Sequence, residues 1–285
     1  MLMGFLNVYK PAGITSHDVV SRMRRVTKIK QIGHTGTLDP FAEGVLPICI
    51  GKSTRLIEYL DDDKEYLAVV QFGKSTTTYD LEGEVTQTYD KKVTEDEITE
   101  ALKTFEGEIS QIPPIYSAIK VNGKKLYDYA RQGQEVQIQP RKVTIEKIEL
   151  KNFDENNQTA DILIKCSKGT YIRSIAHDLG QNLGSGGYLI KLIRTQAGKF
   201  LVGSSINLEE FDCMEKVEQN LINPLKMLDL PKVNITEEEH EKIIHGMPID
   251  NKSFKTGDLI ILIYNDYINA VAVADCDKLR VKKVF

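Results

Sequence analysis

The sequence predicts a mixed α/β fold of two parts, a large domain over residues 1–230 and a small β-barrel over residues 231–285. Amphipathic helical patterns and apolar strand patterns mix along the first part. Pro231 follows a polar, acidic stretch and is typical of a linker, and beyond it short apolar runs alternate with tight turns. With 41% hydrophobic residues in 285, the chain can bury a sizeable core without cross-links.

The first half of the chain contains a well-marked amphipathic helix. Residues 15–30 begin with hydroxyl side chains that can cap a helix. Val19, Met23 and Val26 follow at helical spacing, with arginines on the opposite side. A helix with a basic face is therefore expected. We also predict strands over residues 46–51 and 65–73, a helix over residues 52–60, and an acidic helix over residues 95–109 that stops near Gly107.

The chain changes character over residues 112–142, where tyrosines, lysines and glycines mix with a proline pair. This composition favours a surface insertion or flap over core. Beyond it we predict strands over residues 143–153 and 159–173 and a helix over residues 174–184 that is ended by glycine. In the small module we predict a helix over residues 235–246 and strands over residues 258–264, 268–275 and 279–285, with a turn at Asn265-Asp266.

The formal net charge of −4 hides a segregation of charge along the chain. Residues 1–60 hold eight Lys and Arg against four Asp and Glu, residues 112–142 hold six against two, and residues 163–203 hold six against one. Residues 82–110 and 204–245 are acidic instead. If the three basic segments converge on one face, they form a surface that binds phosphates. Scattered, solvated charge is the alternative.

The cysteines and the absence of sorting signals indicate a cytoplasmic protein. The four cysteines are far apart and form no C-x-x-C pair, which favours buried free thiols over a metal or redox site. They are Cys49, Cys166, Cys213 and Cys276. No basic leader and no stretch of membrane-spanning length is seen. No histidine spacing predicts a metal site, and no phosphate-loop or dinucleotide fingerprint implies a cofactor.

Three stretches have no explanation in composition: NVYKPAGITS at residues 7–16, GHTGTLDP at residues 33–40 and KGTYIRSIAHDLG at residues 168–180. Together they resemble the signature motifs of the family of tRNA pseudouridine synthase B, which isomerises uridine 55 of tRNA. The similarity continues through residues 72–85, 113–133 and 192–200. The resemblance implies a largely antiparallel sheet with flanking helices for residues 1–230, a thumb inserted at about residues 112–142, and a PUA RNA-binding domain at residues 231–285.

The chemistry of this family explains the need for a carboxylate. To make pseudouridine, an enzyme cleaves the bond between C1′ and the base nitrogen, rotates the free uracil, and rejoins it through carbon 5, without a redox agent. An ionised carboxylate in a pocket that excludes water can attack the base or the sugar, or handle a ribose proton. The resemblance implies that Asp39 is this group. An Asp that only caps a turn before Pro40 is the alternative.

Two further residues complete the catalytic set that the resemblance implies. Arg173, at the end of the predicted strand, matches a cation that would keep Asp39 ionised, and a guanidinium can hold a carboxylate through two hydrogen bonds. A surface arginine that contacts phosphate is the alternative. Tyr66 matches the tyrosine that stacks on the flipped base. Because strand alternation puts Tyr66 on the same side as Ala68 and Val70, a core aromatic is its alternative.

Other residues match positions that bind the RNA or line the pocket. His34 matches a histidine that helps to hold the rearranged loop nucleotides, and Tyr171 and Leu192 match pocket-lining positions. Lys10 matches the first motif, where we expect support of the active-site floor. In the thumb we expect phosphate contacts and packing or stacking from Lys120, Lys124, Lys125, Arg131, Tyr127 and Tyr129. A solvated loop is the alternative for that segment.

These features predict a monomeric enzyme that isomerises uridine 55 in the T-loop of tRNA without a metal or cofactor. The expected partner is the T-arm of tRNA, and the acceptor stem is a further contact that the PUA domain could make. A catalytically silent tRNA-binding protein or folding chaperone is an alternative of another class. A glycosidase-like hydrolase is a third option, but it requires a second carboxylate, and the motifs around Asp39 and Arg173 supply no obvious one.

Overall fold

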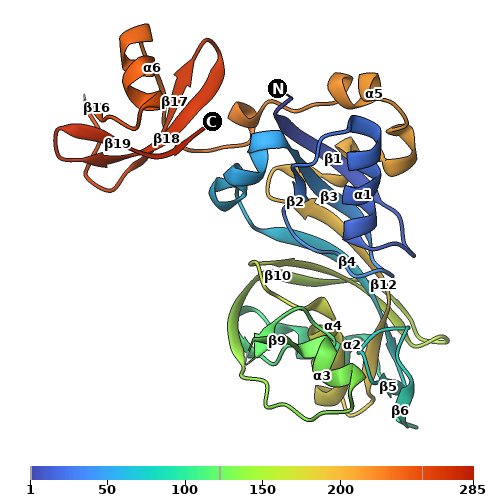
Figure 1. Ribbon diagram of the computed structural model, residues 1–285. Helices are drawn as coiled ribbons and strands as arrows, with labels where there is room; N and C mark the ends of the chain where they lie inside the picture. Colours follow the sequence, from blue (N-terminus) through green and yellow to red (C-terminus); the bar gives the residue numbers. More distant parts are fainter. Residues whose placement is uncertain (1, 122, 252) are drawn as a thin grey trace.

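A ten-stranded sheet forms the frame of the larger part of the molecule (Figure 1). The computed structural model describes residues 2–121, 123–251 and 253–285; Asn122 in the predicted thumb and Lys252 in the C-terminal module lie outside the described residues. The strands are β1 (Gly4–Lys10), β2 (Ile32–His34), β3 (Glu43–Ile50), β4 (Lys64–Phe72), β7 (Gly107–Gln111), β10 (Arg141–Asp154), β11 (Thr159–Cys166), β12 (Gly187–Ala197), β13 (Phe200–Leu201) and β14 (Ile206–Asn207).

The sheet is mostly antiparallel. Its main order is β14-β1-β3-β12-β4-β11-β10-β7, with β2 paired to β3 and β13 to β12. The pairs β1–β14 and β3–β12 are parallel, and the other pairs are antiparallel. The predicted mixed α/β fold with a largely antiparallel sheet is confirmed.

Several helices begin at reciprocal caps. The hydroxyl of Thr15 accepts a hydrogen bond from the backbone N–H of Asp18, whose carboxylate accepts one from the N–H of Thr15, and α1 (Ser16–Thr27) follows. The same cap opens α2 (Glu95–Lys103) and α6 (Glu237–Ile244). The other helices are α3 (Leu126–Arg131), α4 (Ile172–Asn182) and α5 (Met214–Gln219), with 3-10 turns η1 (Gly51–Tyr59), η2 (Val202–Ser204), η3 (Leu208–Glu210) and η4 (Pro224–Lys226).

The central strands differ in how their faces are covered. On β4, Tyr66, Ala68 and Val70 are buried in alternation with half-buried neighbours, as predicted. Strand β1 is buried along nearly its whole length, so its sequence shows no alternation and did not predict a strand. Strand β12 was not predicted either, because two register shifts against β4 and the charged Lys191 and Arg194 interrupt its apolar pattern.

The structure corrects the predicted strand over residues 159–173. Strand β11 ends at Cys166, a turn follows, and α4 begins at Ile172. Gly169 in the turn has a φ of 81°, a left-handed conformation that interrupts the extended run. Arg173 therefore lies in the first turn of a helix and not at the end of a strand.

The predicted thumb contains regular structure. Within residues 112–142, β8 (Lys120–Val121) and β9 (Lys124–Lys125) pair as a short hairpin, and α3 follows directly. Leu126 at the start of α3 is fully buried and donates a backbone hydrogen bond of 2.8 Å to the carbonyl of Ile119. A second hairpin, β5 (Lys74–Thr76) and β6 (Val85–Thr88), encloses the loop of residues 77–84, which approaches the site described below.

The C-terminal module is a five-stranded sheet with α6 packed against it. Its strands are β15 (Lys232–Asn234), β16 (Ile249–Asp250), β17 (Leu259–Tyr264), β18 (Tyr267–Asp275) and β19 (Lys278–Val284), in the order β15-β17-β18-β19-β16. The predicted turn at Asn265 and Asp266 is confirmed, with φ of 49° and 64° at the two residues. The sequence predicted a barrel, whereas these described strands form an open sheet with β15 and β16 at its edges.

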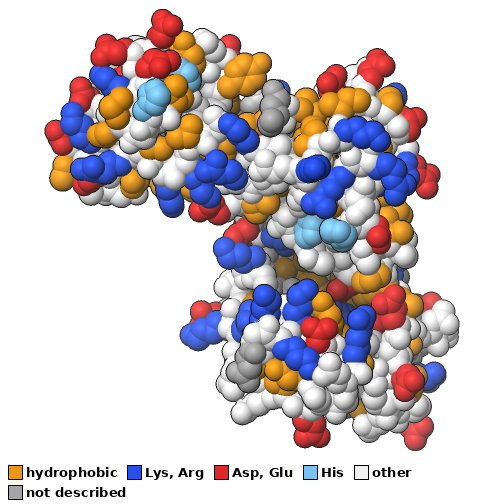
Figure 2. Space-filling view, viewed as in Figure 1, with side chains coloured by type: hydrophobic (Ala, Val, Ile, Leu, Met, Phe, Trp, Pro, Cys, Tyr) orange, Lys and Arg blue, Asp and Glu red, His pale blue; other side chains and the backbone are white. Residues whose placement is uncertain are grey.

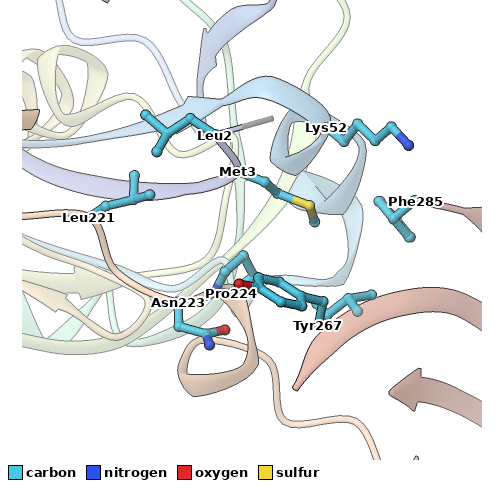
Figure 3. Close-up of a pocket in the computed structure, with 9 residues that line it drawn as sticks. Leu2, Met3, Lys52, Leu221, Asn223, Pro224, Tyr267 and Phe285 are labelled. Carbon is cyan, nitrogen blue, oxygen red and sulfur yellow. The ribbon is translucent and has the colours of Figure 1, made fainter. Parts of the chain in front are cut away.

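The module packs directly on the large domain. Phe5, Leu56 and Phe200 of the large domain share one apolar cluster with Ile261 and Val271 of the module. Figure 1 shows the module beside the end of the sheet that carries the N-terminus. A crevice of about 410 Å³ lies at this junction, and Figure 3 shows side chains that line it. Residues of both parts line it: Leu2, Met3, Lys52, Leu221, Asn223, Pro224, Tyr267, Ile268 and Phe285.

Candidate active site

A cleft of about 650 Å³ opens on the large domain, between the loop after β2 and the thumb. Figure 2 shows Lys and Arg side chains gathered around the hollow on this face. Basic residues from two of the three predicted basic segments line it, together with Lys64. The lining consists of residues 35–40, 116–118 and 167–173 with Lys64, Tyr66, Tyr127, Arg131, Leu192 and Arg194.

The loop that carries Asp39 is held at the residues on either side of it. The hydroxyl of Ser16 donates to the carbonyl of Leu38 at 3.0 Å and accepts from its N–H at 2.8 Å. On the other side, the carbonyl of Pro40 accepts from the N–H of Gly13 at 2.8 Å. The backbone is therefore fixed while the Asp39 side chain keeps 35% of its surface exposed, toward the cleft that it lines.

Lys10 supports this loop from behind. Its side chain is fully buried, and its ammonium group donates to the carbonyls of Pro11 at 2.9 Å, Ile14 at 2.7 Å and Pro40 at 3.2 Å. Burial lowers the pKa of Lys10 to about 8, although Asp39 opposes the shift. The buried ammonium lies behind the loop and does not line the cleft, and its expected support of the active-site floor stays a prediction.

Arg194 holds the same loop further upstream. It is 1% exposed, and its guanidinium donates to the carbonyls of Val45 at 2.7 Å, Gly36 at 3.1 Å and Thr37 at 3.4 Å. Each carbonyl accepts a hydrogen bond from the buried guanidinium and so offsets part of the free energy that burial of its charge costs. Arg194 was not predicted as a site residue, although it lies within the stretch 192–200 that carries part of the resemblance.

Arg173 joins the Asp39 loop to two other segments. Its Nε lies 2.9 Å from Oδ2 of Asp39. Its Nη1 lies 3.3 Å from Oδ2 of Asp80 and donates to the carbonyl of Thr78 at 3.3 Å, and its Nη2 donates to the carbonyl of Tyr116 at 3.0 Å. The structure therefore brings Asp39 and Arg173 together, but through one nitrogen and one oxygen instead of the two hydrogen bonds expected.

Asp80 is a second carboxylate at this arginine, which the sequence analysis missed. It is 2% exposed, and its Oδ1 accepts hydrogen bonds from the N–H of Glu82 at 3.0 Å and from the hydroxyl of Thr78. The motifs around Asp39 and Arg173 supply no obvious second acid, and the structure brings one to Arg173 from another segment. Asp80 lies in the stretch 72–85, and only the fold brings it to Arg173.

The electrostatics of Asp39 are set by opposing effects. Burial raises the pKa of its carboxyl above 3.8, Arg173 and Lys10 lower it, and the charge of Asp80 raises it further. The net direction is upward, so Arg173 limits the shift without reversing it. A carboxylate with a raised pKa is a better base and nucleophile than one in water.

Three further predicted residues line the cleft: Tyr66, Tyr171 and Leu192. Tyr66 is 7% exposed and pairs in register with Arg194 across β4 and β12. It is thus both a core residue and part of the cleft wall, so its two interpretations are compatible. Tyr171 precedes α4, where its N–H and carbonyl bind the Gln111 side chain at 2.8 and 3.0 Å.

His34 stands apart from this group. It ends β2, its Nδ1 is buried without a hydrogen-bond partner, and burial lowers its pKa. The described residues that line the cleft begin at Thr35 and do not include His34.

The thumb reaches the cleft through Tyr127 and Arg131, which line it. The guanidinium of Arg131 lies 5.4 Å from the ring centre of Tyr127, and the ammonium of Lys125 lies 5.1 Å from it. Lys124 lies 4.4 Å from the ring of Tyr129. Lys120, Lys124 and Lys125 do not line the cleft itself, but the three lie on the hairpin directly before α3.

The described residues also bear on metal binding and on membrane spanning. Within residues 2–121, 123–251 and 253–285, no group of three or more His, Cys, Asp and Glu is arranged to hold a metal ion. Over the same described ranges, no helix is long and apolar enough to cross a membrane.

Comparison with known proteins assigns the chain to a family. Residues 24–172 match the family model described as "TruB family pseudouridylate synthase (N terminal domain)". The chain is 42% identical, over 99% of both chains, to "tRNA pseudouridine synthase B" of Caldanaerobacter subterraneus subsp. tengcongensis. The chain belongs to the TruB family of pseudouridylate synthases. The TruB relative from Carboxydothermus hydrogenoformans, which has the same name, is 42% identical over 99% of this chain and 98% of its own.

Solved structures similar to this TruB family member share its fold. One, titled "Crystal Structure of a Cbf5-Nop10-Gar1 Complex", has a TM-score of 0.74 and 28% identity, and the match covers 99% of this chain and 84% of that one. Another, "Structure of H/ACA RNP bound to a substrate RNA containing 2'-deoxyuridine", has a TM-score of 0.73 and 26% identity over the same shares. The sequence-based assignment to the family is thus confirmed.

Proposed function

We propose that this chain converts uridine 55 in the T-loop of tRNA to pseudouridine, with Asp39 as the acting carboxylate. The reaction breaks the C1′–N1 bond, turns the uracil, and forms a C1′–C5 bond, so the base keeps its atoms apart from a proton exchanged with solvent. The observation that carries the proposal is the contact of 2.9 Å between Asp39 and Arg173 in the wall of the cleft. The names of the relatives supply the substrate class.

Asp39 meets the requirements of this chemistry. The first step is attack on carbon 6 of the base, attack on C1′, or removal of a ribose proton, and each begins from an ionised carboxylate. Arg173 lies against the Asp39 carboxylate and opposes its protonation, while the fixed backbone at Leu38 and Pro40 aims it at the cleft. Asp80 is almost fully buried and engaged with Arg173, so we assign it to holding that arginine and not to acid–base chemistry.

The cleft suits a nucleotide that has been flipped out of its stack. A stacked T-loop uridine must leave the stack before its C1′ is accessible. Tyr66 offers an aromatic face in the wall of the cleft, and Tyr171 and Leu192 line the same space. We assign Tyr66 to stacking on the uracil, Tyr171 and Leu192 to shaping the pocket, and His34 to the loop nucleotides around it.

Basic residues around the cleft provide the RNA-binding surface. Arg131 and Lys168 line the cleft, and the thumb lysines Lys120, Lys124 and Lys125 extend the surface onto the T-arm. In this proposal residues 1–230 form the catalytic domain and residues 231–285 form a PUA domain that reaches the acceptor stem. The enzyme works as a cytoplasmic monomer.

The proposal is tested by mapping pseudouridine in unmodified tRNA after incubation with the wild-type chain or with Asp39→Asn, without added cofactor. We expect pseudouridine at position 55 with the wild-type chain only. Tight binding without product in both samples would identify a tRNA-binding or folding protein instead. Product at another position would overturn the assignment of the T-loop.

A further inference from the structure

The loop between β5 and β6 binds Arg173 through the two residues that flank Tyr79. The carbonyl of Thr78 accepts from Nη1 of Arg173 at 3.3 Å, and the Asp80 carboxylate lies 3.3 Å from the same nitrogen. The backbone conformation of Tyr79 therefore sets the positions of both groups. A rotation at this residue would move the Asp80 carboxylate relative to the Thr78 carbonyl, so that both could no longer contact Nη1 of Arg173.

Tyr79 holds a conformation that its residue type disfavours. Its φ is 63°, in the left-handed region that non-glycine residues seldom adopt. Such a residue persists when the surrounding structure imposes it. One restraint is a backbone hydrogen bond of 3.0 Å from the N–H of Leu189 to the carbonyl of Tyr79. A second restraint acts on the ring.

The ring of Tyr79 stacks on the ring of His177. Their centres are 3.9 Å apart and their planes differ by 13°. His177 lies on α4 four residues after Arg173, so the two side chains are one turn apart on the same side of the helix. Helix α4 thus holds the loop at two points, through the guanidinium of Arg173 and through the ring of His177.

We propose that His177 is a positioning residue for the isomerisation. Its ring stacks on Tyr79 and keeps the loop in the conformation that places Thr78 and Asp80 on Arg173, and through Arg173 it orients Asp39. The inference rests on the proposed role of Asp39 and adds a residue outside the cleft, since His177 is not among the described residues that line it.

The protonation state of His177 agrees with this role. Its Nδ1 is buried without a hydrogen-bond partner, and burial lowers its pKa, so the ring is neutral at neutral pH. Stacking and shape are then its contributions, and an apolar aromatic ring of similar size should replace it. This expectation separates stacking from acid–base or hydrogen-bonding roles.

The test compares steady-state kinetics on unmodified tRNA for His177→Ala and His177→Phe. We expect His177→Ala to lower kcat by about 10-fold to 100-fold, because a misplaced catalytic group loses rate steeply, with KM changed less than about twofold. We expect His177→Phe to restore kcat to within about threefold of wild type. Unchanged kcat in His177→Ala, or an equal fall in both variants, would overturn the proposal.

Two further variants keep the test decisive. Tyr79→Gly removes the ring and also relieves the disfavoured φ, so it should fold and yet lose kcat as His177→Ala does; a fully active Tyr79→Gly would overturn the proposal even if His177→Ala does not fold. The chain offers a matched control in His240→Ala, because His240 stacks on Tyr264 with ring centres 4.2 Å apart in the C-terminal module. His240 lies in the module assigned to the acceptor stem, and its Nδ1 lies 2.9 Å from the Asn269 amide nitrogen, so kcat is compared at saturating tRNA, where it should be unchanged. An equal fall in kcat would overturn the proposal, because the effect would not be specific to α4.

Asp39→Asn is assayed in parallel to separate the two proposals. An inactive Asp39→Asn with a fully active His177→Ala would overturn only the role of His177. A fully active Asp39→Asn would overturn the proposed function of Asp39 and the inference with it.

Discussion

Asp39 and Asp80 share one guanidinium: Arg173 lies 2.9 Å from the first through Nε and 3.3 Å from the second through Nη1. The two carboxylates differ in exposure, since the Asp39 side chain is 35% exposed and the Asp80 side chain 3%. Arg173 is therefore anchored on its buried side by Asp80 and faces the cleft where it meets Asp39. From this difference in exposure we assign Asp80 to holding Arg173 in place and Asp39 to the chemical step.

Replacing Asp80 should damage both stability and rate. Asp80→Asn leaves the buried Arg173 with one carboxylate fewer, and we expect a loss of about 3–5 kcal/mol in unfolding free energy, the range for breaking a buried charge pair. We expect kcat to fall at least about 10-fold because Arg173 loses its anchor. Denaturant unfolding and steady-state kinetics measure the two effects. Glu84→Gln, an exposed change in the same loop, is the control, and equal behaviour of the two variants would contradict the account.

The pH dependence of the rate should report the raised pKa of Asp39. The active form is ionised, so the rate falls as pH drops through that pKa, and the acid limb should lie above pH 3.8. The charge of Asp80 raises the pKa of Asp39, so Asp80→Asn should move the limb to lower pH. Single-turnover rates between about pH 4 and pH 8 locate the limb in each protein. A limb that stays in place in Asp80→Asn would show that the two acids are not coupled.

The raised pKa of Asp39 should also make the free energy of unfolding depend on pH in a defined direction. Because folding raises the pKa of Asp39, the folded state holds this proton to higher pH than the unfolded state, and stability falls as pH rises from 3.8 through the raised pKa. Asp39→Asn does not titrate, so its unfolding free energy relative to wild type should increase across that window. Denaturant unfolding at several pH values measures the difference. A difference that is constant with pH would contradict the raised pKa.

Arg194 should prove sensitive to a conservative change. Its guanidinium donates to three carbonyls, and an ammonium group cannot reproduce that planar geometry. Arg194→Lys should therefore lower the free energy of unfolding by about 1–3 kcal/mol. It should also lower kcat, because Gly36 and Thr37 in the loop that carries Asp39 lose their hydrogen bonds. Lys191→Arg is the matched swap at an exposed position of the same strand. Thermal unfolding and kcat should distinguish them. A harmless Arg194→Lys would remove this residue from the positioning of the loop.

The thumb lysines should govern the salt dependence of tRNA binding. Reversing both charges in Lys124→Glu with Lys125→Glu should weaken binding and reduce the slope of log K against log salt by about two, one for each phosphate that the thumb no longer neutralises. Lys147→Glu with Lys151→Glu makes the same charge change at lysines that pair with Glu149 on β10. An unchanged slope in the thumb variant would count against the predicted binding of phosphates by the thumb.

Sequence patterns predicted the elements whose burial alternates or whose ends are capped. Residues 65–73 alternate cleanly, and the caps and periodicity of residues 15–30 predicted α1. Strand β1 was not predicted because both of its faces are covered. Arg173 was placed on a strand because the predicted strand ran through the polar turn at residues 167–170. The local sequence pattern of a strand does not show which distant segments cover its faces.

Some residues of the candidate site were predicted from sequence motifs, and others were found only in the structure. Asp39, Arg173 and Tyr66 were named from motifs, and the structure brings them to one cleft. Asp80 and Arg194 were not named, because a buried charge is recognised by its distant partners, and those are brought together only by the fold. The Tyr79–His177 stack also joins residues that are far apart in the chain, and no periodicity predicts it.

The most direct test is the single-turnover rate of pseudouridine formation with Asp39→Asn, measured beside its affinity for unmodified tRNA. The account predicts a rate lowered by at least about 1,000-fold, as for removal of an acting catalytic group, with affinity within about threefold of wild type. A variant that binds tRNA normally and keeps more than about a tenth of the wild-type rate would contradict it.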